Sequence, residues 1–296
     1  MVPMPTASIN ETINTQQHVM AAVQGERNTS KGGIFSLHDS TSLVTGGARG
    51  IGLTMAAALL EAGSHVVCLD LLEEPVDAPE YIALRSRAKE LKLTVGYFQA
   101  DITDADAINS IVDQIGQEAK DADRPLKSVI HGAAVQKQGP VLDFDPKFFD
   151  WVMRINVTGT FIVTQAAARA MKKYETGGSI ILMASISGFI SNRGLLGTAY
   201  NSSKAAVHQL CRCAAVELAE YGIRVNTISP GYIATDMTKQ LLVGKTELMK
   251  QWTGDNPMNR MGEPSEFKGA AVYLASEASS FMTGSDLRID GGHCCW

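Results

Sequence analysis

The sequence lacks the features that mark several common classes of protein. Its 296 residues contain no apolar run near ~18 residues, so no membrane-spanning helix is expected. The 26 basic side chains are fewer than the 31 acidic ones and form no cluster, which argues against binding to the phosphate backbone of nucleic acids. The five cysteines have neither zinc-type spacing nor the pattern of a disulfide framework. We therefore expect a reduced, cytoplasmic protein without a metal site.

Beyond its first residues, the chain has the composition of one globular domain. Hydrophobic residues make up 45% and charged residues 19% of the sequence. Residues 1–36 are polar and show no periodicity, and they fit neither a signal peptide nor a mitochondrial presequence. We expect them to form a flexible N-terminal extension of no assigned function. The domain itself is expected over residues 37–296.

Short apolar segments then alternate with helical ones. The apolar segments are continuous, as expected for parallel strands whose two faces are covered by helices. This alternation predicts an α/β protein with a doubly wound parallel sheet. Helices are expected up to Glu61, over 105–119 and 199–221, and through a stretch with apolar residues at three- to four-residue spacing from Val152 to Ala166. The expected strands are 42–45, 65–69, 93–98, 128–130, 179–183, 224–228 and 287–289.

A glycine-rich turn between the first strand and its helix predicts a dinucleotide site. Gly46, Gly50 and Gly52 have no Cβ, so a pyrophosphate can approach the backbone N–H groups at the positive end of the helix. Their spacing is Gly-x3-Gly-x-Gly rather than the commoner Gly-x-Gly-x-x-Gly. Asp70, at the end of the second strand, can accept hydrogen bonds from the adenosine ribose. Asp101, after the third strand, fits either a contact with the adenine amino group or a turn or helix cap.

A tyrosine and a lysine indicate the chemistry. Tyr200 and Lys204 are four residues apart on an expected helix, so their side chains lie on one face. A free phenol has a pKa of ~10, and a nearby ammonium favours the phenolate. We expect Lys204 to lower the pKa of Tyr200 by about 3 units, so that the phenol exchanges a proton with an alcohol or ketone. Ser185, after the fifth strand, can hold the same oxygen. An exposed helix face is the competing explanation for the pair.

Together these residues resemble the short-chain dehydrogenase/reductase family, over roughly residues 43–292. The resemblance implies a single-domain Rossmann fold with seven parallel strands in the order 3-2-1-4-5-6-7. It also implies an NAD(P)-dependent oxidoreductase that moves a hydride between the cofactor and a secondary alcohol or ketone. Fungal-type polyol and ketose reductases look nearest. The matching motifs are Thr45-Gly46-x3-Gly50-x-Gly52, Asn156, Ser185, Tyr200-x3-Lys204 and Pro230-Gly231.

The resemblance also implies residue roles. Tyr200 would be the proton donor and acceptor, and Ser185 would position the reacting oxygen. Lys204 would lower the tyrosine pKa and bind the nicotinamide ribose, while Asn156 would hold a water in the proton relay. A mobile substrate lid would lie near residues 232–262. The residues expected to contact the cofactor are Gly46, Arg49, Gly50, Ile51, Gly52, Asp70, Asp101, Ile102, Gly132, Ala133, Tyr200, Lys204, Pro230, Ile233 and Thr235.

Two segments depart from the family pattern. His131-Gly132-Ala133-Ala134 replaces the usual Asn-Asn-Ala-Gly after the fourth strand, and we expect a packed, neutral histidine there rather than a catalytic one. The segment 192–197 is less polar than is usual in sugar-alcohol reductases. Four apolar residues in this segment and just before it would make the rim of the site apolar, which casts doubt on a polyol substrate and admits a larger alcohol or ketone. These residues are Phe189, Ile190, Leu195 and Leu196.

The choice of cofactor depends on two opposing side chains. Asp70 would repel the 2′-phosphate of NADP, whereas Arg49 would attract it. No second basic residue follows the strand, because Leu71, Leu72, Glu73 and Glu74 come next. We therefore expect NAD, with NADP as the alternative.

Other functions and the assembly stay open at this point. The same fold can carry a non-catalytic dinucleotide-binding scaffold or sensor, or a cofactor-dependent epimerase or dehydratase. The resemblance implies a homotetramer in which helices over 152–170 and 205–218 pair across a two-fold axis. Packing of these helices on their own sheet is the competing explanation for their small residues. Those residues are Gly159, Ala166, Ala167, Ala206, Ala214 and Ala215.

Overall fold

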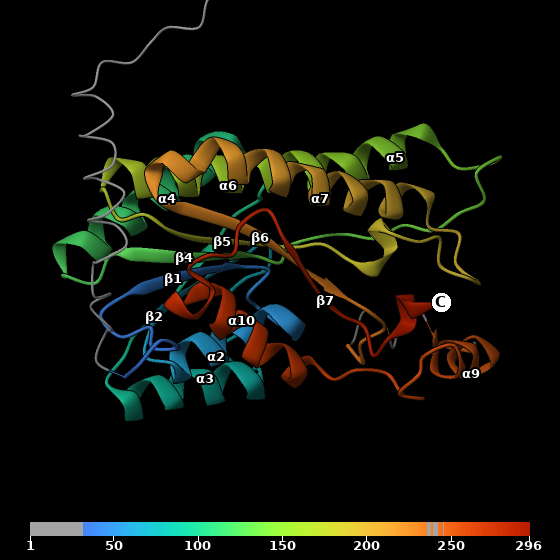
Figure 1. The fold of residues 1–296 in the computed structure, drawn as a ribbon, viewed down its shortest axis with the longest axis horizontal. Coiled ribbons are helices and arrows are strands. Elements are labelled where there is room, and N and C mark those ends of the chain that lie inside the picture. Colours follow the sequence, from blue (N-terminus) through green and yellow to red (C-terminus); the bar gives the residue numbers. More distant parts are fainter. Residues whose placement is uncertain (1–31, 236–237, 239–241, 245) are drawn as a thin grey trace, which may run out of the picture.

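The computed structural model describes residues 32–235, 238, 242–244 and 246–296. One parallel sheet lies at its centre, with the order β3-β2-β1-β4-β5-β6-β7, which confirms the expected doubly wound Rossmann-type topology (Figure 1). The strands are β1 (Thr41–Thr45), β2 (His65–Asp70), β3 (Val95–Gln99), β4 (Leu126–His131), β5 (Gly178–Met183), β6 (Ile223–Pro230) and β7 (Asp286–Ile289).

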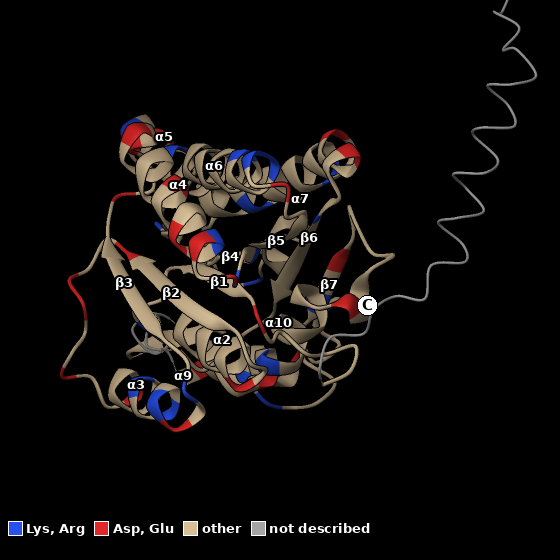
Figure 2. Cartoon of the chain, turned by 90° about the vertical axis from the view of Figure 1, so that its left-hand side faces the viewer, with Lys and Arg blue, Asp and Glu red and all other residues tan. Residues whose placement is uncertain are grey.

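Two layers of helices cover the sheet. Helices α4 (Ala105–Asp121), α6 (Thr160–Lys173) and α7 (Thr198–Leu218) lie on one face, and α2 (Gly50–Glu61), α3 (Pro79–Leu91) and α10 (Lys268–Ala275) lie on the other (Figure 1). Lys, Arg, Asp and Glu are concentrated on the outer sides of these helices and in the loops, while the central strands carry few of them (Figure 2). This double covering explains why every residue of β1 is buried. No helix within the described residues has the length and apolarity needed to cross a membrane.

Two of the three helices on the face covered by α2, α3 and α10 were not predicted. The interpretation of the sequence placed nothing between the second and third strands, where α3 lies, and nothing before the last strand, where α10 lies. Helix α3 buries few residues and is otherwise polar, so its apolar stripe is narrow. Helix α10 is short and contains small residues, which give a weak periodic signal. Its buried residues are Ala270, Ala271, Leu274 and Ala275.

The long helix predicted around Val152 is interrupted. It consists of α5 (Pro146–Met153), a π-helical segment η1 (Arg154–Gly159) and α6, which follow one another without a break. The wider π turn changes the direction in which side chains project and is common at functional sites. Asn156 lies in this segment and is 1% exposed.

Little of the predicted N-terminal extension can be compared with the structure. Residues 1–31 lie outside the described residues. Within 32–36, the carbonyl of Ile34 accepts a hydrogen bond from the Ala278 amide (3.0 Å). Leu37, which begins the predicted domain, is 5% exposed, and its amide donates to the Ala62 carbonyl. The domain therefore begins with a segment that is hydrogen-bonded to the turn after α2.

Candidate active site

A cavity of about 600 Å³ lies at the carboxyl ends of the strands. The parallel register aligns Thr45 with Leu69 and with His131, so the segments that follow β1, β2 and β4 meet at one edge. This is the position at which open α/β sheets bind ligands. Every residue of the sequence-predicted site except Asn156 lines the cavity. These residues are Gly46, Arg49, Gly50, Ile51, Gly52, Asp70, Asp101, Ile102, Gly132, Ala133, Ser185, Tyr200, Lys204, Pro230, Ile233 and Thr235.

The glycine turn has the shape of a cradle for a phosphate. A Cβ on Gly46 would lie 2.7 Å from the Ala133 amide, and one on Gly52 would lie 2.1 Å from the Gly46 carbonyl oxygen. The turn is therefore too tight for a side chain at either position. Gly50 has a φ of +60° and no atom within 4 Å of its Cβ position, so its outer side is open. Helix α2 begins here and has no acidic residue in its first turn to compensate its positive end.

Asp70 is held by the backbone on both sides. Its Oδ2 accepts a hydrogen bond from the Ala48 amide (3.1 Å), and its Oδ1 accepts one from the Leu72 amide (3.2 Å). The following loop is fixed from β3, where the Tyr97 hydroxyl donates to the Leu72 carbonyl (2.8 Å) and Gln99 Nε2 donates to the Leu71 carbonyl (3.1 Å). The carboxylate is thus oriented at the cavity and retains lone pairs for further donors.

Asp101 also lines the cavity, and it serves the local chain as well. Its Oδ1 accepts a hydrogen bond from the Thr103 amide (2.8 Å). This is the turn aspartate that was the competing interpretation. A contact of Asp101 with an adenine group remains a prediction.

Ser185, Tyr200 and Lys204 meet at the floor of the cavity. Lys204 is 4% exposed, and its Nζ donates a hydrogen bond to the Met183 carbonyl (2.6 Å), the last residue of β5. Its Nζ lies 5.7 Å from the centre of the Tyr200 ring. Ser185 has an extended backbone, and its Oγ accepts from the Ser187 amide (3.1 Å), which fixes the side chain beside Tyr200.

The pKa values of the pair differ from the expectation. Burial lowers the pKa of Lys204 to about 8. Burial also raises the pKa of Tyr200, and an interaction with the Ser185 side chain acts in the opposite direction. We expected the ammonium to lower the pKa of the phenol. Desolvation of the phenolate is the larger effect here, and the Lys204 ammonium donates to the Met183 carbonyl.

Asn156 does not line the cavity, but it is hydrogen-bonded to segments that do. Its Oδ1 accepts from the Val135 amide (2.8 Å), and its Nδ2 donates to the Val135 carbonyl (2.9 Å) and to Ser203 Oγ (3.0 Å). The Ser203 hydroxyl in turn donates to the Tyr200 carbonyl (2.7 Å). Both amide hydrogens of Asn156 are therefore engaged. The side chain links the segment after β4 to the turn of α7 that carries Tyr200. The predicted contact with a water would have to use the second lone pair of Asn156 Oδ1.

His131, which replaces the usual asparagine, is packed and neutral, as expected. It is 2% exposed, and its Nδ1 lies 2.7 Å from the Thr45 hydroxyl. Burial, and secondarily the charge of Lys204, lowers the pKa of His131 to about 3. Its Nε2 is buried without a partner among the described atoms. The imidazole thus connects β4 to the residue before the glycine turn and does not line the cavity.

The apolar rim was predicted incorrectly. Of its four apolar residues only Leu195 lines the cavity. Phe189 packs on His208 with ring centres 4.1 Å apart and is 50% exposed, and Leu196 is 56% exposed. Other residues supply this end. They are Gln136, Trp151, Asn192, Tyr232, Thr238 and Trp252. Tyr232, Thr238 and Trp252 among them belong to the segment 232–262 that was predicted as the substrate lid.

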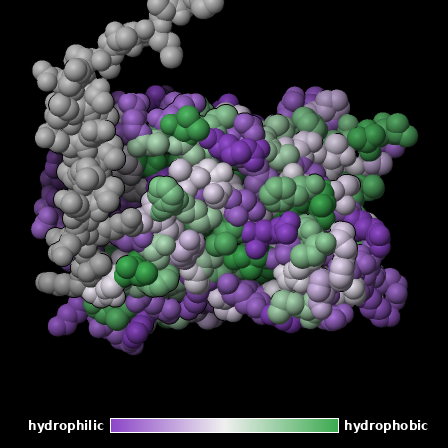
Figure 3. Space-filling view, viewed as in Figure 1, coloured by the Kyte–Doolittle hydropathy of each residue, from purple (hydrophilic) through white to green (hydrophobic). Residues whose placement is uncertain are grey.

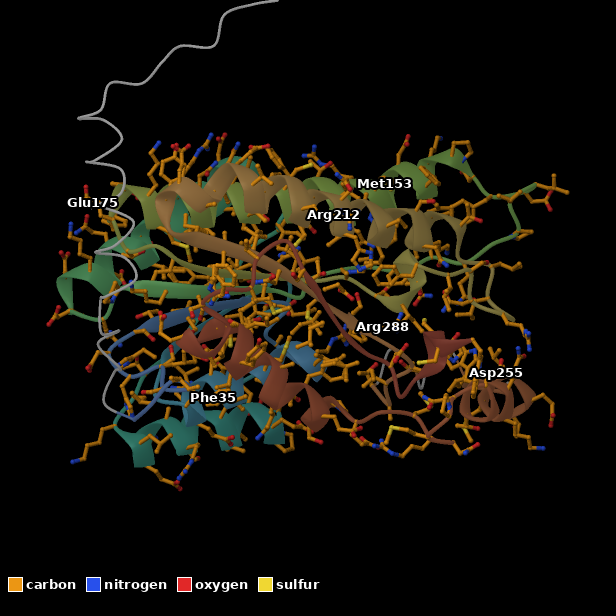
Figure 4. The ribbon with its side chains drawn as sticks, in the orientation of Figure 1. Phe35, Met153, Glu175, Arg212, Asp255 and Arg288 are labelled. Carbon is orange, nitrogen blue, oxygen red and sulfur yellow. The ribbon has the colours of Figure 1, made fainter. Side chains whose placement is uncertain are left out.

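Segments from distant parts of the chain build this end. Figure 4 shows Met153, at the end of α5, and Asp255, just after α9 (Thr246–Gly254), toward the same end of the molecule, with Phe35 and Glu175 toward the other. The predicted lid segment includes Tyr232 and Trp252, but no local pattern indicated that their rings stack on each other. The lid predicted near 232–262 falls partly on residues 236–237, 239–241 and 245, which lie outside the described residues. The described part contains no cluster of three or more His, Cys, Asp or Glu suited to a metal ion.

Known proteins resemble the chain along most of its length. Residues 46–293 match the family model described as enoyl-(acyl carrier protein) reductase. The short chain dehydrogenases/reductase notP' of Aspergillus versicolor is 39% identical, over 99% of this chain and 100% of that protein. A D-arabinitol 2-dehydrogenase (ribulose-forming) of Candida tropicalis is 35% identical, over 88% of this chain and 95% of its own. The crystal structure of a gluconate 5-dehydrogenase from Burkholderia cenocepacia, in complex with NADP and tartrate, has a TM-score of 0.79 and 30% identity, and the match covers 89% of this chain and 98% of that one.

Proposed function

The chain belongs to the short-chain dehydrogenase/reductase family, and on that premise we propose that it interconverts a polyol and a ketose, with NAD(H) as its preferred cofactor. As a member of this family it is an NAD(P)-dependent oxidoreductase that transfers a hydride between a secondary alcohol and a ketone. The expected similarity to polyol dehydrogenases is confirmed. The observation that carries the proposal is the convergence of Ser185, Tyr200 and Lys204 on the cavity that the glycine turn also lines.

The residues divide the work of the reaction. When bound, the nicotinamide accepts the hydride in alcohol oxidation and delivers it in ketone reduction. The Tyr200 hydroxyl gives its proton to the carbonyl oxygen in reduction, and the Tyr200 phenolate takes the proton of the alcohol in oxidation. The Ser185 hydroxyl holds that same oxygen. Lys204 has three ammonium hydrogens, of which Met183 accepts one, so two are left for the hydroxyls of a ribose.

The preference for NAD(H) is supported by the charges around the adenosine end. Asp70 is fixed in the cavity wall. The loop that follows it is held in place by hydrogen bonds from Tyr97 and Gln99 to its carbonyl oxygens. A 2′-phosphate there would meet a carboxylate at short range. Arg49 is exposed and is the one basic residue of the glycine turn. A fixed repulsion outweighs a single mobile attraction, although a solved relative contains NADP.

A homotetramer in the cytoplasm completes the proposal. The small residues first considered for the interface offer little support, because Gly159, Ala166, Ala167 and Ala215 are buried within the monomer. The outer faces give better support, since Phe161 on α6 is 50% exposed and Val216 on α7 is 81% exposed. Hydrophobic residues also occur among the hydrophilic ones on the face shown in Figure 3. All five cysteines are free, as a reducing compartment would keep them.

A panel of alcohols and ketones tests the function. Purified protein with NAD or NADH is given D-arabinitol, xylulose or a bulky aromatic ketone, and cofactor absorbance is followed. We expect turnover with the polyol and the ketose, and loss of at least about 100-fold in kcat in Tyr200→Phe, since a general acid–base contributes 10²–10⁴-fold. Binding of NADH by that variant should stay close to wild type. A scaffold or sensor would give no turnover, and an epimerase or dehydratase would convert substrate with no net change in the cofactor.

A further inference from the structure

A chain of hydrogen bonds determines the orientation of Tyr232 at the substrate end of the cavity. The chain starts at the Ile190 carbonyl, which can only accept, and Asn201 Nδ2 donates to it (2.9 Å). The same nitrogen donates to Asn192 Oδ1 (3.0 Å), so the oxygen of Asn192 is assigned. Asn192 therefore presents its nitrogen to the Tyr232 hydroxyl, which accepts (3.1 Å).

It follows that the Tyr232 hydrogen is not used by Asn192. A phenol has one hydrogen to donate, and within the described residues no acceptor for it is found. Tyr232 is 9% exposed and Asn192 is 4% exposed, and both line the cavity. A buried hydroxyl that accepts but does not donate is an incompletely satisfied polar group, which favours a ligand that supplies an acceptor.

The ring of Tyr232 is fixed as firmly as its hydroxyl. It stacks on Trp252 of α9 with ring centres 4.0 Å apart and planes 4° apart, and the edge of His293 meets it at 5.0 Å and 80°. The amide of Gly262 donates to the Tyr232 carbonyl (2.9 Å). The Trp252 Nε1 is a second buried donor without a described partner. The position of Tyr232 in the cavity wall is therefore fixed by its ring contacts and by its backbone.

We propose that the Tyr232 hydroxyl donates a hydrogen bond to a second oxygen of the substrate, away from the reacting carbon, and so selects oxygenated alcohols and ketones. The inference depends on the proposed function, because Tyr200 and Ser185 must hold the reacting oxygen in the same cavity. Asn192 and Asn201 are positioning residues that keep the hydrogen of Tyr232 free. A ketone without a second oxygen would leave this donor unpaired, and such mismatches are the strongest source of discrimination in polar sites.

Matched ketone pairs test this directly. Hydroxyacetone and 2-butanone, 4-hydroxy-2-butanone and 2-pentanone, and 5-hydroxy-2-pentanone and 2-hexanone differ only in a hydroxyl that replaces a methyl group. We expect the wild type to prefer the hydroxylated member of at least one pair by roughly 10-fold in kcat/KM, as one net hydrogen bond gives. Tyr232→Phe keeps the ring stack and should bring that ratio close to one. Tyr221→Phe is the control, because Tyr221 lies outside the cavity with its ring against the Lys172 ammonium. This variant should keep the wild-type ratio.

A second variant removes the hydrogen without removing the hydroxyl. In Asn192→Asp the carboxylate still accepts from Asn201 but cannot donate, so the Tyr232 hydroxyl donates to it instead. The ratio should fall as in Tyr232→Phe, and the double variant should show no further loss, because both changes remove the same interaction. A merely structural role for Tyr232 would lower kcat/KM for both members of a pair and leave the ratio unchanged.

The outcomes separate this inference from the proposed function. Turnover with no preference in any pair, or an unchanged ratio in Tyr232→Phe, overturns the role of Tyr232 and leaves the oxidoreductase intact. Absence of turnover with every ketone and alcohol counts against the proposed function. In that case, binding of the same pairs to the protein with NADH is followed by tryptophan fluorescence, which Trp252 reports. Equal affinity within every pair then overturns the inference as well.

Discussion

The buried histidine at the end of β4 should make the protein sensitive to mild acid. The ordinary histidine pKa is 6.5, and burial lowers that of His131 to about 3. Below pH 6.5 the unfolded chain binds a proton at this residue that the folded chain does not bind. The free energy of unfolding therefore decreases as the pH falls. The contribution is almost absent at pH 7 and reaches about 2 kcal/mol at pH 5. This value depends on the ordinary pKa, because a folded-state pKa near 3 or 4 changes it by less than about 0.1 kcal/mol.

His131→Asn removes this contribution. Asparagine can still bond to the Thr45 hydroxyl and restores the residue that the family usually has, but it does not titrate. We expect the wild type to lose about 2 kcal/mol more than the variant in free energy of unfolding between pH 7 and pH 5. Urea unfolding at both pH values, at one fixed protomer concentration, measures the difference. Comparison of the two chains cancels the titration of all other groups.

His38→Asn is the matched control, because His38 is exposed. It should keep the wild-type difference between the two pH values. Equal pH dependence in the wild type and in His131→Asn would show that the imidazole is protonated or solvated in the folded protein. The account of His131 as a neutral packed group would then be wrong.

Three further changes address the charges and the assembly. Burial lowers the pKa of Lys204 from 10.5 to about 8. The cost of burying its charge is therefore fully present below pH 8 and disappears above pH 10.5. Between these values the wild type should gain roughly 3 kcal/mol in free energy of unfolding relative to Lys204→Met, measured by urea unfolding. Asp70→Ser should lower the ratio of kcat/KM for NAD over NADP by roughly 10-fold or more, and a wild type that already favours NADP would show that Arg49 prevails. Light scattering at micromolar concentration should give a tetramer, and Val216→Glu should dissociate it, because a charge would replace an exposed apolar side chain in the interface.

The central part of the site followed from the sequence because it depends on local order along the chain. Parallel strands end at one edge, so the residue after each strand can be assigned to that edge without knowing its contacts. This placed Gly46, Asp70, Asp101 and Ser185 together, and all of them line the cavity. The four-residue spacing on one helix likewise placed Tyr200 beside Lys204.

The substrate end did not follow, because distant segments build it. Tyr232 meets Asn192 from 40 residues away, and its stacking on Trp252 joins the end of β6 to α9. Apolar residues in the 189–197 segment were assigned to the rim from composition alone. Whether such a side chain faces the cavity depends on the direction of an irregular loop, and there Phe189 turns toward His208. Periodicity gives no information on that direction.

The direction of the Tyr200 pKa shift was equally beyond the sequence, since it depends on burial rather than on neighbours in the chain. A lysine four residues from a tyrosine suggests attraction, yet Lys204 is 4% exposed and bonds to the Met183 carbonyl. Burial of Lys204 makes the folded protein less stable throughout the range below pH 8, and burial of His131 adds to this cost only below pH 6.5. Each group is held at a strand end by a hydrogen bond, His131 to the Thr45 hydroxyl and Lys204 to the Met183 carbonyl. Lys204 lines the cavity and uses one ammonium hydrogen for Met183, so two hydrogens are left for a hydroxyl ligand, and a hydrogen bond to a charged group is strongest where water is excluded.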